Sequence, residues 1–144
     1  VANAALAAGA HVVGVIPRVL QEREVGHRGL HEQHVVETMH QRKQMMAERA
    51  HAFLALPGGI GTFEELFEVW TWRQLGYHDQ PIGLLNVAGY YDGLVGFMAH
   101  TVAEGFLSPR QLEVVTTGDD VATLLDRLHT LAGGADGADD FGRI

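Results

Sequence analysis

Short apolar segments that alternate with longer helical ones constrain the fold of this chain more than any other feature. The apolar segments predict strands at residues 11–16, 52–56, 82–87 and 112–116. Small-residue or amphipathic patterns predict helices at residues 1–8, 35–50, 63–75, 90–104 and 119–131. Strands that alternate with helices form parallel sheets, and strands without a polar face are covered on both sides. We therefore expect an α/β fold with a doubly wound, Rossmann-like parallel sheet flanked by helices.

The remaining segments predict a loop and a tail. Residues 18–34 are polar and contain Gly26 and Gly29, a pattern that indicates a loop. Residues 132–144 are rich in Gly, Ala and Asp, and we expect this acidic tail to be disordered because it has little apolar surface to bury. The length of 144 residues, 47% of them hydrophobic, suits one domain. We place that domain at residues 1–131.

Charge and composition exclude several classes of protein. The formal net charge of −8 argues against a nucleic-acid-binding protein, because such proteins neutralise phosphates with basic side chains. The chain contains no cysteine, which excludes disulfide scaffolds and thiolate metal sites. No apolar run approaches the roughly 20 residues that a transmembrane helix needs. We therefore expect a soluble, cytoplasmic protein that binds neither nucleic acid nor a membrane.

The turn Pro57-Gly58-Gly59-Ile60-Gly61 is the first candidate binding site. It joins a predicted strand to a predicted helix, which is where open parallel sheets bind ligands. Glycines allow close approach of the backbone, and the start of the helix offers N–H groups that attract a phosphate. The turn matches neither the dinucleotide-binding motif nor the Walker A loop. The alternative is a tight strand-to-helix turn that binds no ligand.

Glu65 and Arg42 are the candidate charged groups. Thr62-Phe63-Glu64-Glu65 has the spacing of a capping box, so Glu65 either caps the helix or faces whatever the glycine turn binds. Arg42 shares a helix face with Met39 and Met46. A guanidinium on such a face suits a phosphate or carboxylate partner. The alternative is an arginine whose apolar stem lies on the protein and whose charge lies in water.

Two segments together resemble the LOG family of cytokinin riboside 5′-monophosphate phosphoribohydrolases. They are T-M-H-Q-R-K at residues 38–43 and P-G-G-I-G-T-F-E-E at residues 57–65, against a family signature P-G-G-x-G-T-x-x-E preceded by an R-K helix. Residues 70–76 and 83–91 are also similar to that family, and the resemblance extends from Val1 to about Leu131. Family members normally begin with two strands that carry Gly-Ser-Ser and Gly-Gly-Gly turns. We therefore expect the N-terminal strands of the fold to be missing here.

The resemblance implies hydrolysis of the N-glycosidic bond of a nucleoside 5′-monophosphate, either AMP or N6-substituted AMP. The products would be the free base and ribose 5-phosphate, and the reaction would need no cofactor. In this interpretation Arg42 and Glu65 are catalytic. The phosphate-binding turn falls on Gly58, Gly59, Gly61 and Thr62, and further substrate contacts fall on Lys43, Met39 and Glu24.

The resemblance also implies a homodimer. The predicted helix at residues 63–75 is apolar around much of its circumference, which is more than one core contact requires. A second copy of the chain would cover the additional apolar face. The alternative is a helix that is buried on all sides within one subunit.

Three other functions remain open on the sequence alone. A metal hydrolase would use the histidine-rich segment His31-Glu32-Gln33-His34, but its spacing differs from H-E-x-x-H, and we expect no metal site. A pyridoxal phosphate enzyme needs a lysine for its Schiff base, and Lys43 is the only lysine of the chain. A non-catalytic nucleotide or cofactor carrier would use the same glycine turn without turnover.

Overall fold

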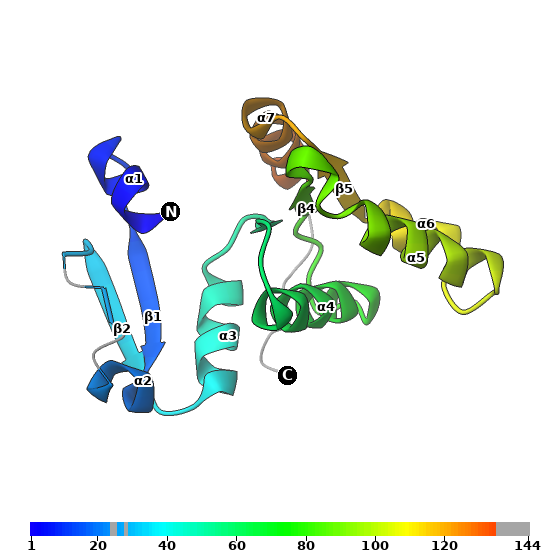
Figure 1. Cartoon of the computed structure of the whole chain (residues 1–144). Coiled ribbons are helices and arrows are strands. Elements are labelled where there is room, and N and C mark those ends of the chain that lie inside the picture. Colours follow the sequence, from blue (N-terminus) through cyan, green and yellow to red (C-terminus); the bar gives the residue numbers. More distant parts are fainter. Residues whose placement is uncertain (24–25, 28, 135–144) are drawn as a thin grey trace. The chain divides into compact units, whose positions relative to one another are not determined.

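A computed structural model describes residues 1–23, 26–27 and 29–134 (Figure 1). The helices are α1 (Ala2–Ala7), α2 (Arg18–Glu22), α3 (Met39–Glu48), α4 (Ile60–Gln74), α5 (Asp92–Ala103), α6 (Pro109–Glu113) and α7 (Val121–Ala132). The strands are β1 (Val13–Pro17), β2 (Glu32–Val36), β3 (Phe53–Ala55), β4 (Ile82–Leu85) and β5 (Val115–Gly118), and η1 (Val87–Gly89) is a 3₁₀ helix. The chain divides into two compact units, Val1–Arg49 and Ala50–Ile144.

The first unit contains a two-stranded parallel sheet. β1 pairs with β2 in the register Val13↔Glu32 to Pro17↔Val36, and α3 packs against both strands. α3 begins with a capping box in which Thr38 Oγ1 accepts a hydrogen bond from the Gln41 backbone N–H at 3.1 Å. The Gln41 side chain accepts one from the Thr38 N–H at 3.2 Å. These two bonds satisfy N–H groups at the helix start and fix where the arginine-bearing helix begins.

The prediction of a loop at residues 18–34 is wrong at both ends of the segment. Arg18–Glu22 forms α2, and the strand β2 begins at Glu32. Most residues of β2 are exposed, and only Val36 is buried, so the segment lacks the apolar run by which strands are recognised. Backbone pairing with β1 makes it a strand. Strand formation depends strongly on such tertiary context, which a polar sequence does not reveal.

The second unit contains a three-stranded parallel sheet in the order β3-β4-β5. Residues of β4 alternate between its two faces. Ile82 and Leu84 face a core that includes Leu66 and Trp70 of α4, whereas Leu85 packs with Leu124 and Leu128 of α7. All four residues of β4 are buried. Figure 1 shows β4 and β5 between α4 and α7. The central strand is therefore covered on both faces, as its uniformly apolar sequence predicts.

The predicted strand at residues 112–116 begins too early. Residues Pro109–Glu113 form α6, and β5 starts only at Val115. Ser108 caps this short helix through a capping box with Gln111, and Pro109 occupies its first turn. A proline at that position is favourable because its missing N–H would have no acceptor in the helix. The local capping signal therefore outweighs the apolar run that follows it.

The fold class is confirmed: parallel strands are flanked by helices in an α/β arrangement consistent with a Rossmann-like fold. Five strands occur among the described residues, in two separate sheets, where the sequence predicted four strands in one sheet. The other predicted helices and strands are present, with shifted ends. Residues 135–144, most of the predicted tail, lie outside the described part of the chain.

Candidate phosphate-binding and catalytic site

The glycine turn lies at the carboxyl edge of the three-stranded sheet. β3 ends at Ala55, and the chain passes through Pro57 and Gly58 before α4 begins at Ile60. Because the three strands are parallel, the segments after β4 and β5 leave the sheet at the same edge. The turn therefore occupies the place where open α/β sheets bind their ligands.

The start of α4 presents backbone donors. Gly59 is the N-cap residue, and within the described part of the chain no side chain caps this helix. The N–H groups of Thr62 and Phe63 both donate to the Gly59 carbonyl, at 3.0 and 3.2 Å. Ile60 and Gly61 precede them, in positions where a helix has no carbonyl of its own to offer. A helix start with such N–H groups and the positive end of its dipole attracts an anion.

This geometry corrects the predicted capping box. Thr62 is the third residue of α4 rather than its cap, because the helix begins three residues earlier than the sequence pattern indicates. Glu65 therefore lies in the second helical turn, too far along the helix to cap its first N–H groups. The capping explanation for Glu65 is excluded, and its carboxylate stays a candidate for chemistry.

The glycines of the turn are of two kinds. A Cβ on Gly58 would lie 2.2 Å from Thr62 Oγ1 and 3.0 Å from Thr62 Cβ, so packing within the chain requires glycine there. A Cβ on Gly59 or Gly61 would meet no described heavy atom within 4 Å. Their backbone conformations impose no need for glycine, since neither has a positive φ. Internal packing therefore explains why glycine is needed at position 58 only. The open space at Gly59 and Gly61 leaves room for a ligand.

Glu65 follows Gly61 by four residues on α4, so the two share a face of the helix. Cα–Cβ bonds in a helix tilt towards its N-terminus. Helix geometry therefore directs the Glu65 side chain towards the side on which Gly61 leaves open space. Glu65 is partly buried. A carboxylate thus follows the backbone donors on the same face of the same helix.

The segment that follows β4 contacts the glycine turn and its flank, although none of its residues was predicted to be functional. Tyr90 Oη donates to the Gly58 carbonyl oxygen at 2.5 Å, and Tyr91 Oη donates to the Leu56 carbonyl oxygen at 2.6 Å. Tyr91 is fully buried, and this burial, aided by the neighbouring Tyr90, raises the pKa of its phenol. The signal in the sequence is the Asn-x-x-Gly-Tyr-Tyr stretch directly after a buried strand.

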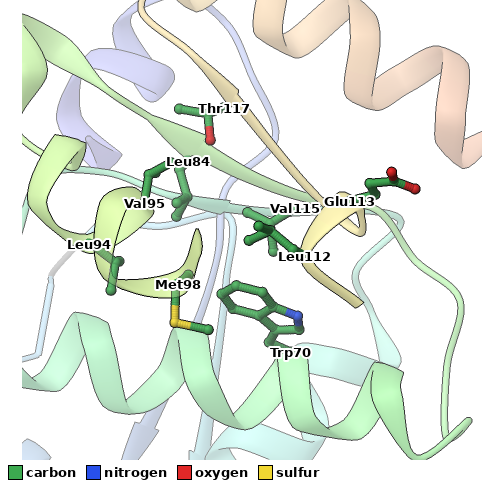
Figure 2. A pocket seen from close by; sticks show the side chains of 9 residues that line it. All are labelled: Trp70, Leu84, Leu94, Val95, Met98, Leu112, Glu113, Val115 and Thr117. Carbon is green, nitrogen blue, oxygen red and sulfur yellow. The ribbon is translucent and has the colours of Figure 1, made fainter. Parts of the chain in front are cut away.

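The described residues of the second unit form a polar cleft and an apolar cavity. The polar cleft of about 430 Å³ opens at the carboxyl edge of the sheet, lined by Asn86, Ala88, Gly89, Asp92, Thr117, Gly118 and Asp119. The apolar cavity of about 220 Å³ lies over the face of β4 and β5. Figure 2 shows the Trp70 ring and Met98 close together in its wall, with the carboxylate of Glu113 at one side. The apolar cavity has few hydrogen-bond donors for a phosphate.

The other predicted residues belong to the first unit. Met39, Arg42 and Lys43 all lie on α3. Met39 is 45% exposed, whereas Arg42 and Lys43 are partly buried. Glu24 lies outside the described residues. The structure therefore brings together Gly58, Gly59, Gly61, Thr62 and Glu65 on one turn and helix, and it places the basic pair on a separate, well-capped helix.

The histidine-rich segment forms part of a surface cluster. Glu32 of β2 contacts His11 Nε2 at 2.9 Å and His34 Nε2 at 3.2 Å, and these hydrogen bonds lower the pKa of its carboxyl group. Among the described residues no group of three or more His, Cys, Asp or Glu side chains is arranged to hold a metal ion. No helix in the same residues combines the length and apolar character needed to cross a membrane.

Comparison with known proteins decides the family. The family model described as "Possible lysine decarboxylase" matches residues 1–128. The chain is 48% identical over 124 residues to the cytokinin riboside 5′-monophosphate phosphoribohydrolase LOG3 of Arabidopsis thaliana, covering 86% of this chain and 58% of that protein. It is 47% identical over 129 residues to the cytokinin riboside 5′-monophosphate phosphoribohydrolase LOG1 of the same plant, an alignment that covers 90% of this chain and 61% of that protein. The chain belongs to this family, the LOG family.

The LOG relatives are longer than this chain, which spans 58% and 61% of the two that it resembles. In this chain the segment P-G-G-I-G-T-F-E-E, residues 57–65, forms the turn before α4 and the first two turns of that helix. Tyr90 donates a hydrogen bond to Gly58 within this segment, whereas Tyr91 donates to Leu56, which precedes it. Among the described residues this segment is therefore a helix start without a side-chain cap, and Tyr90, from the turn after β4, holds it in place.

Proposed function

We propose that this protein is an N-glycosidic hydrolase acting on nucleoside 5′-monophosphates. The substrate class is adenosine 5′-monophosphate modified at N6, and the products are the free base and ribose 5-phosphate. The relatives named as cytokinin riboside 5′-monophosphate phosphoribohydrolases support this substrate, at 47% to 48% identity. The reaction that we propose uses no cofactor.

The form of the glycine turn carries the proposal. Backbone donors at the start of α4 lie beside open space at Gly59 and Gly61, and Glu65 follows on the face of Gly61. A 5′-phosphate would accept hydrogen bonds from these N–H groups, with the helix dipole favouring its charge. These hydrogen bonds to the 5′-phosphate would also let the protein distinguish a nucleoside monophosphate from a nucleoside, which has no phosphate. A phosphate held there places the sugar within reach of a carboxylate from the second helical turn.

Glu65 supplies the chemistry in this mechanism. Breaking the N-glycosidic bond builds positive charge on the ribose and negative charge on the departing base. A carboxylate near the anomeric carbon stabilises the oxocarbenium-like transition state and accepts a proton from the attacking water. The water oxygen bonds to the anomeric carbon, and the bonding electron pair of the glycosidic bond leaves with the base, which takes up a proton.

The basic pair on α3 is assigned to orientation. Arg42 stays positively charged at any physiological pH and presents a planar set of donors to phosphate or ribose oxygens. Lys43 and Met39 are proposed as further substrate contacts, and Glu24 as an acidic one. Holding the substrate in a reactive orientation lowers the barrier by removing translational and rotational freedom before the reaction.

The family description names a lysine decarboxylase, and we do not assign that activity. Pyridoxal phosphate chemistry needs a lysine that forms a Schiff base. Lys43 is the only lysine of the chain, and it is adjacent to Arg42 in the LOG motif. The names of the similar relatives, which describe phosphoribohydrolases, agree better with the glycine turn and Glu65 than a decarboxylase does.

We further propose that the protein works as a homodimer in the cytoplasm. Ile60, Phe67 and Leu75 are spaced along one face of α4 and are 86%, 38% and 60% exposed. A second copy covering this face would remove apolar surface from water. Nucleoside monophosphates are cytoplasmic metabolites, which supports the compartment. Residues 1–131 are proposed to act as one nucleotide-binding, catalytic domain.

Base release from defined substrates tests the function. The purified protein is incubated with AMP and with N6-isopentenyl AMP, and the free base is quantified chromatographically. The Glu65→Gln variant runs in parallel. Release by the wild type that disappears in the variant supports the proposal. Nucleotide binding without any release of base would contradict it and would instead identify a carrier.

A further inference from the structure

The Gly58–Gly59 peptide is the most easily rotated peptide group of the glycine turn. Glycine residues on both sides let it turn through a half rotation without steric penalty from a Cβ. In a planar trans peptide the C=O and N–H groups point in opposite directions. The Gly58 carbonyl and the Gly59 N–H therefore always point to opposite sides of the turn. The orientation of this peptide therefore decides whether a donor or an acceptor faces a ligand.

Tyr90 fixes that orientation. Its hydroxyl donates to the Gly58 carbonyl oxygen at 2.5 Å, a short distance for a hydrogen bond between neutral groups. The Tyr90 ring packs edge-on against the ring of Tyr91, with 5.0 Å between ring centroids and an interplanar angle of 85°. Rotation of the Gly58–Gly59 peptide would break the hydrogen bond and place the carbonyl oxygen on the donor side of the turn.

The segment that carries Tyr90 is itself held in place. Asn86 Oδ1 accepts from the Tyr91 backbone N–H at 2.6 Å, and Asn86 Nδ2 donates to Asp92 Oδ1 at 2.7 Å. Ala88 has a φ of +52°, a left-handed conformation that non-glycine residues adopt only when their surroundings impose it. A strained but firmly bonded turn thus presents the tyrosine hydroxyl from a fixed position.

We propose that Tyr90 is a positioning residue that keeps the Gly59 N–H directed at the substrate phosphate. The proposal rests on the proposed function and adds to it the group that orients the phosphate-binding turn. Tyr90 does not touch the reacting atoms in this assignment. It acts through the Gly58–Gly59 peptide, and its loss converts one donor of the anion site into a mobile peptide that also exposes an acceptor to the phosphate.

Phosphate binding by the variant Tyr90→Phe tests the proposal. Calorimetry measures the Kd of ribose 5-phosphate for the wild type, for Tyr90→Phe and for the control Tyr91→Phe. Tyr91→Phe removes the equivalent hydrogen bond, to Leu56 O, from a peptide that lies outside the glycines. We expect Tyr90→Phe to raise the Kd about tenfold, as loss of one strong hydrogen bond to the turn would. The control should bind within twofold of the wild type and unfold at a lower temperature.

Turnover kinetics provide the second readout. The value of kcat/KM for the nucleoside monophosphate should fall in Tyr90→Phe mainly through KM, because the Glu65 carboxylate is unchanged. Equal ribose 5-phosphate Kd values in the wild type and Tyr90→Phe would overturn the proposal even if the wild type releases base. A wild type that binds ribose 5-phosphate but releases no base would contradict the proposed hydrolysis alone. A wild type that neither binds ribose 5-phosphate nor releases base would overturn both.

Discussion

Thr62 Oγ1 lies against Gly58 so closely that a Cβ on the glycine would approach it to 2.2 Å. The contact packs the third residue of α4 onto the turn that precedes the helix. It means that one glycine of the turn is required by the protein's own packing. Gly59 and Gly61 have open space beside them, so internal packing does not explain why glycine occurs there. Binding of a ligand would explain it.

Replacement of Gly58 by alanine is expected to destabilise the protein. The new methyl group would clash with Oγ1 and Cβ of Thr62. Rotation about χ1 leaves Cβ in place, and branching at Cβ restricts the rotamers by which Oγ1 could move away. Overpacking of this kind costs about 1–3 kcal/mol. Chemical denaturation of Gly58→Ala against the wild type measures the loss. The double variant with Thr62→Ala should recover part of it, and a single variant as stable as the wild type would contradict the packing argument.

Replacement of Gly61 by alanine is expected to preserve stability but to lower activity. No described atom lies within 4 Å of the new Cβ, and alanine is a better helix former than glycine by about 1 kcal/mol. The free energy of unfolding should therefore stay equal or rise. A methyl group in the open space would obstruct a phosphate approaching the backbone, so kcat/KM should fall at least tenfold. Retained kcat/KM in a stable Gly61→Ala variant would argue against phosphate binding at this turn.

The variant Glu65→Gln tests the catalytic carboxylate. Loss of a general base typically lowers the rate by about 10²–10⁴-fold. The effect should appear in kcat, because the phosphate-binding turn is unaltered. Glu64→Gln is the matched control, since Glu64 is the preceding residue of α4 and is exposed. Steady-state kinetics of both variants decide the matter. Comparable losses from the two substitutions would indicate a general effect of charge on α4.

Asp120 is expected to make the stability of α7 sensitive to acid. Its carboxylate accepts hydrogen bonds from the Thr123 hydroxyl at 2.6 Å and from the Thr123 N–H at 2.8 Å, and these lower its pKa from 3.8. A depressed folded-state pKa gives stability that is present above the unfolded value and is lost as the pH falls through the folded value. The cap should therefore weaken below about pH 4.

Two variants distinguish the stability that the Asp120 cap contributes from the pH dependence that its carboxylate causes. Asp120→Ala should have a lower free energy of unfolding at neutral pH than the wild type, because the cap is removed. Asp120→Asn keeps a capping oxygen that does not titrate, so it should be near wild-type stability at neutral pH and lose less between pH 5 and pH 3. Denaturation curves across that range measure both. An acid response of Asp120→Asn equal to that of the wild type would assign the sensitivity to other carboxylates.

The exposed apolar face of α4 is expected to mediate self-association. Leu75→Glu places a charge on this face, at a position that is 60% exposed and therefore tolerant of it in the monomer. Light scattering coupled to size-exclusion chromatography should show a dimer for the wild type and a larger fraction of monomer for the variant. Thermal unfolding checks that the fold is retained. A monomeric wild type would contradict the proposed homodimer.

The sequence by itself determined the α/β class, the position of the glycine turn and the central buried strand. Residues 82–85 are apolar throughout, and a strand of this kind has to be covered on both faces whatever its neighbours are. The Pro-Gly-Gly-x-Gly segment likewise breaks regular structure through its own backbone preferences. These features depend on the properties of residues that are consecutive in the sequence. They can therefore be predicted without knowledge of the tertiary structure.

Only the tertiary structure decided the features that depend on distant partners. β2 is a strand because its backbone pairs with β1, although its side chains are mostly polar and exposed. α4 begins at Ile60 rather than after Thr62, which removes the capping role from Glu65. The hydrogen bond from Tyr90 to Gly58 joins residues separated by 32 positions. Hydrogen bonds across such separations depend on the packing of whole elements, and no local pattern of side chains encodes them.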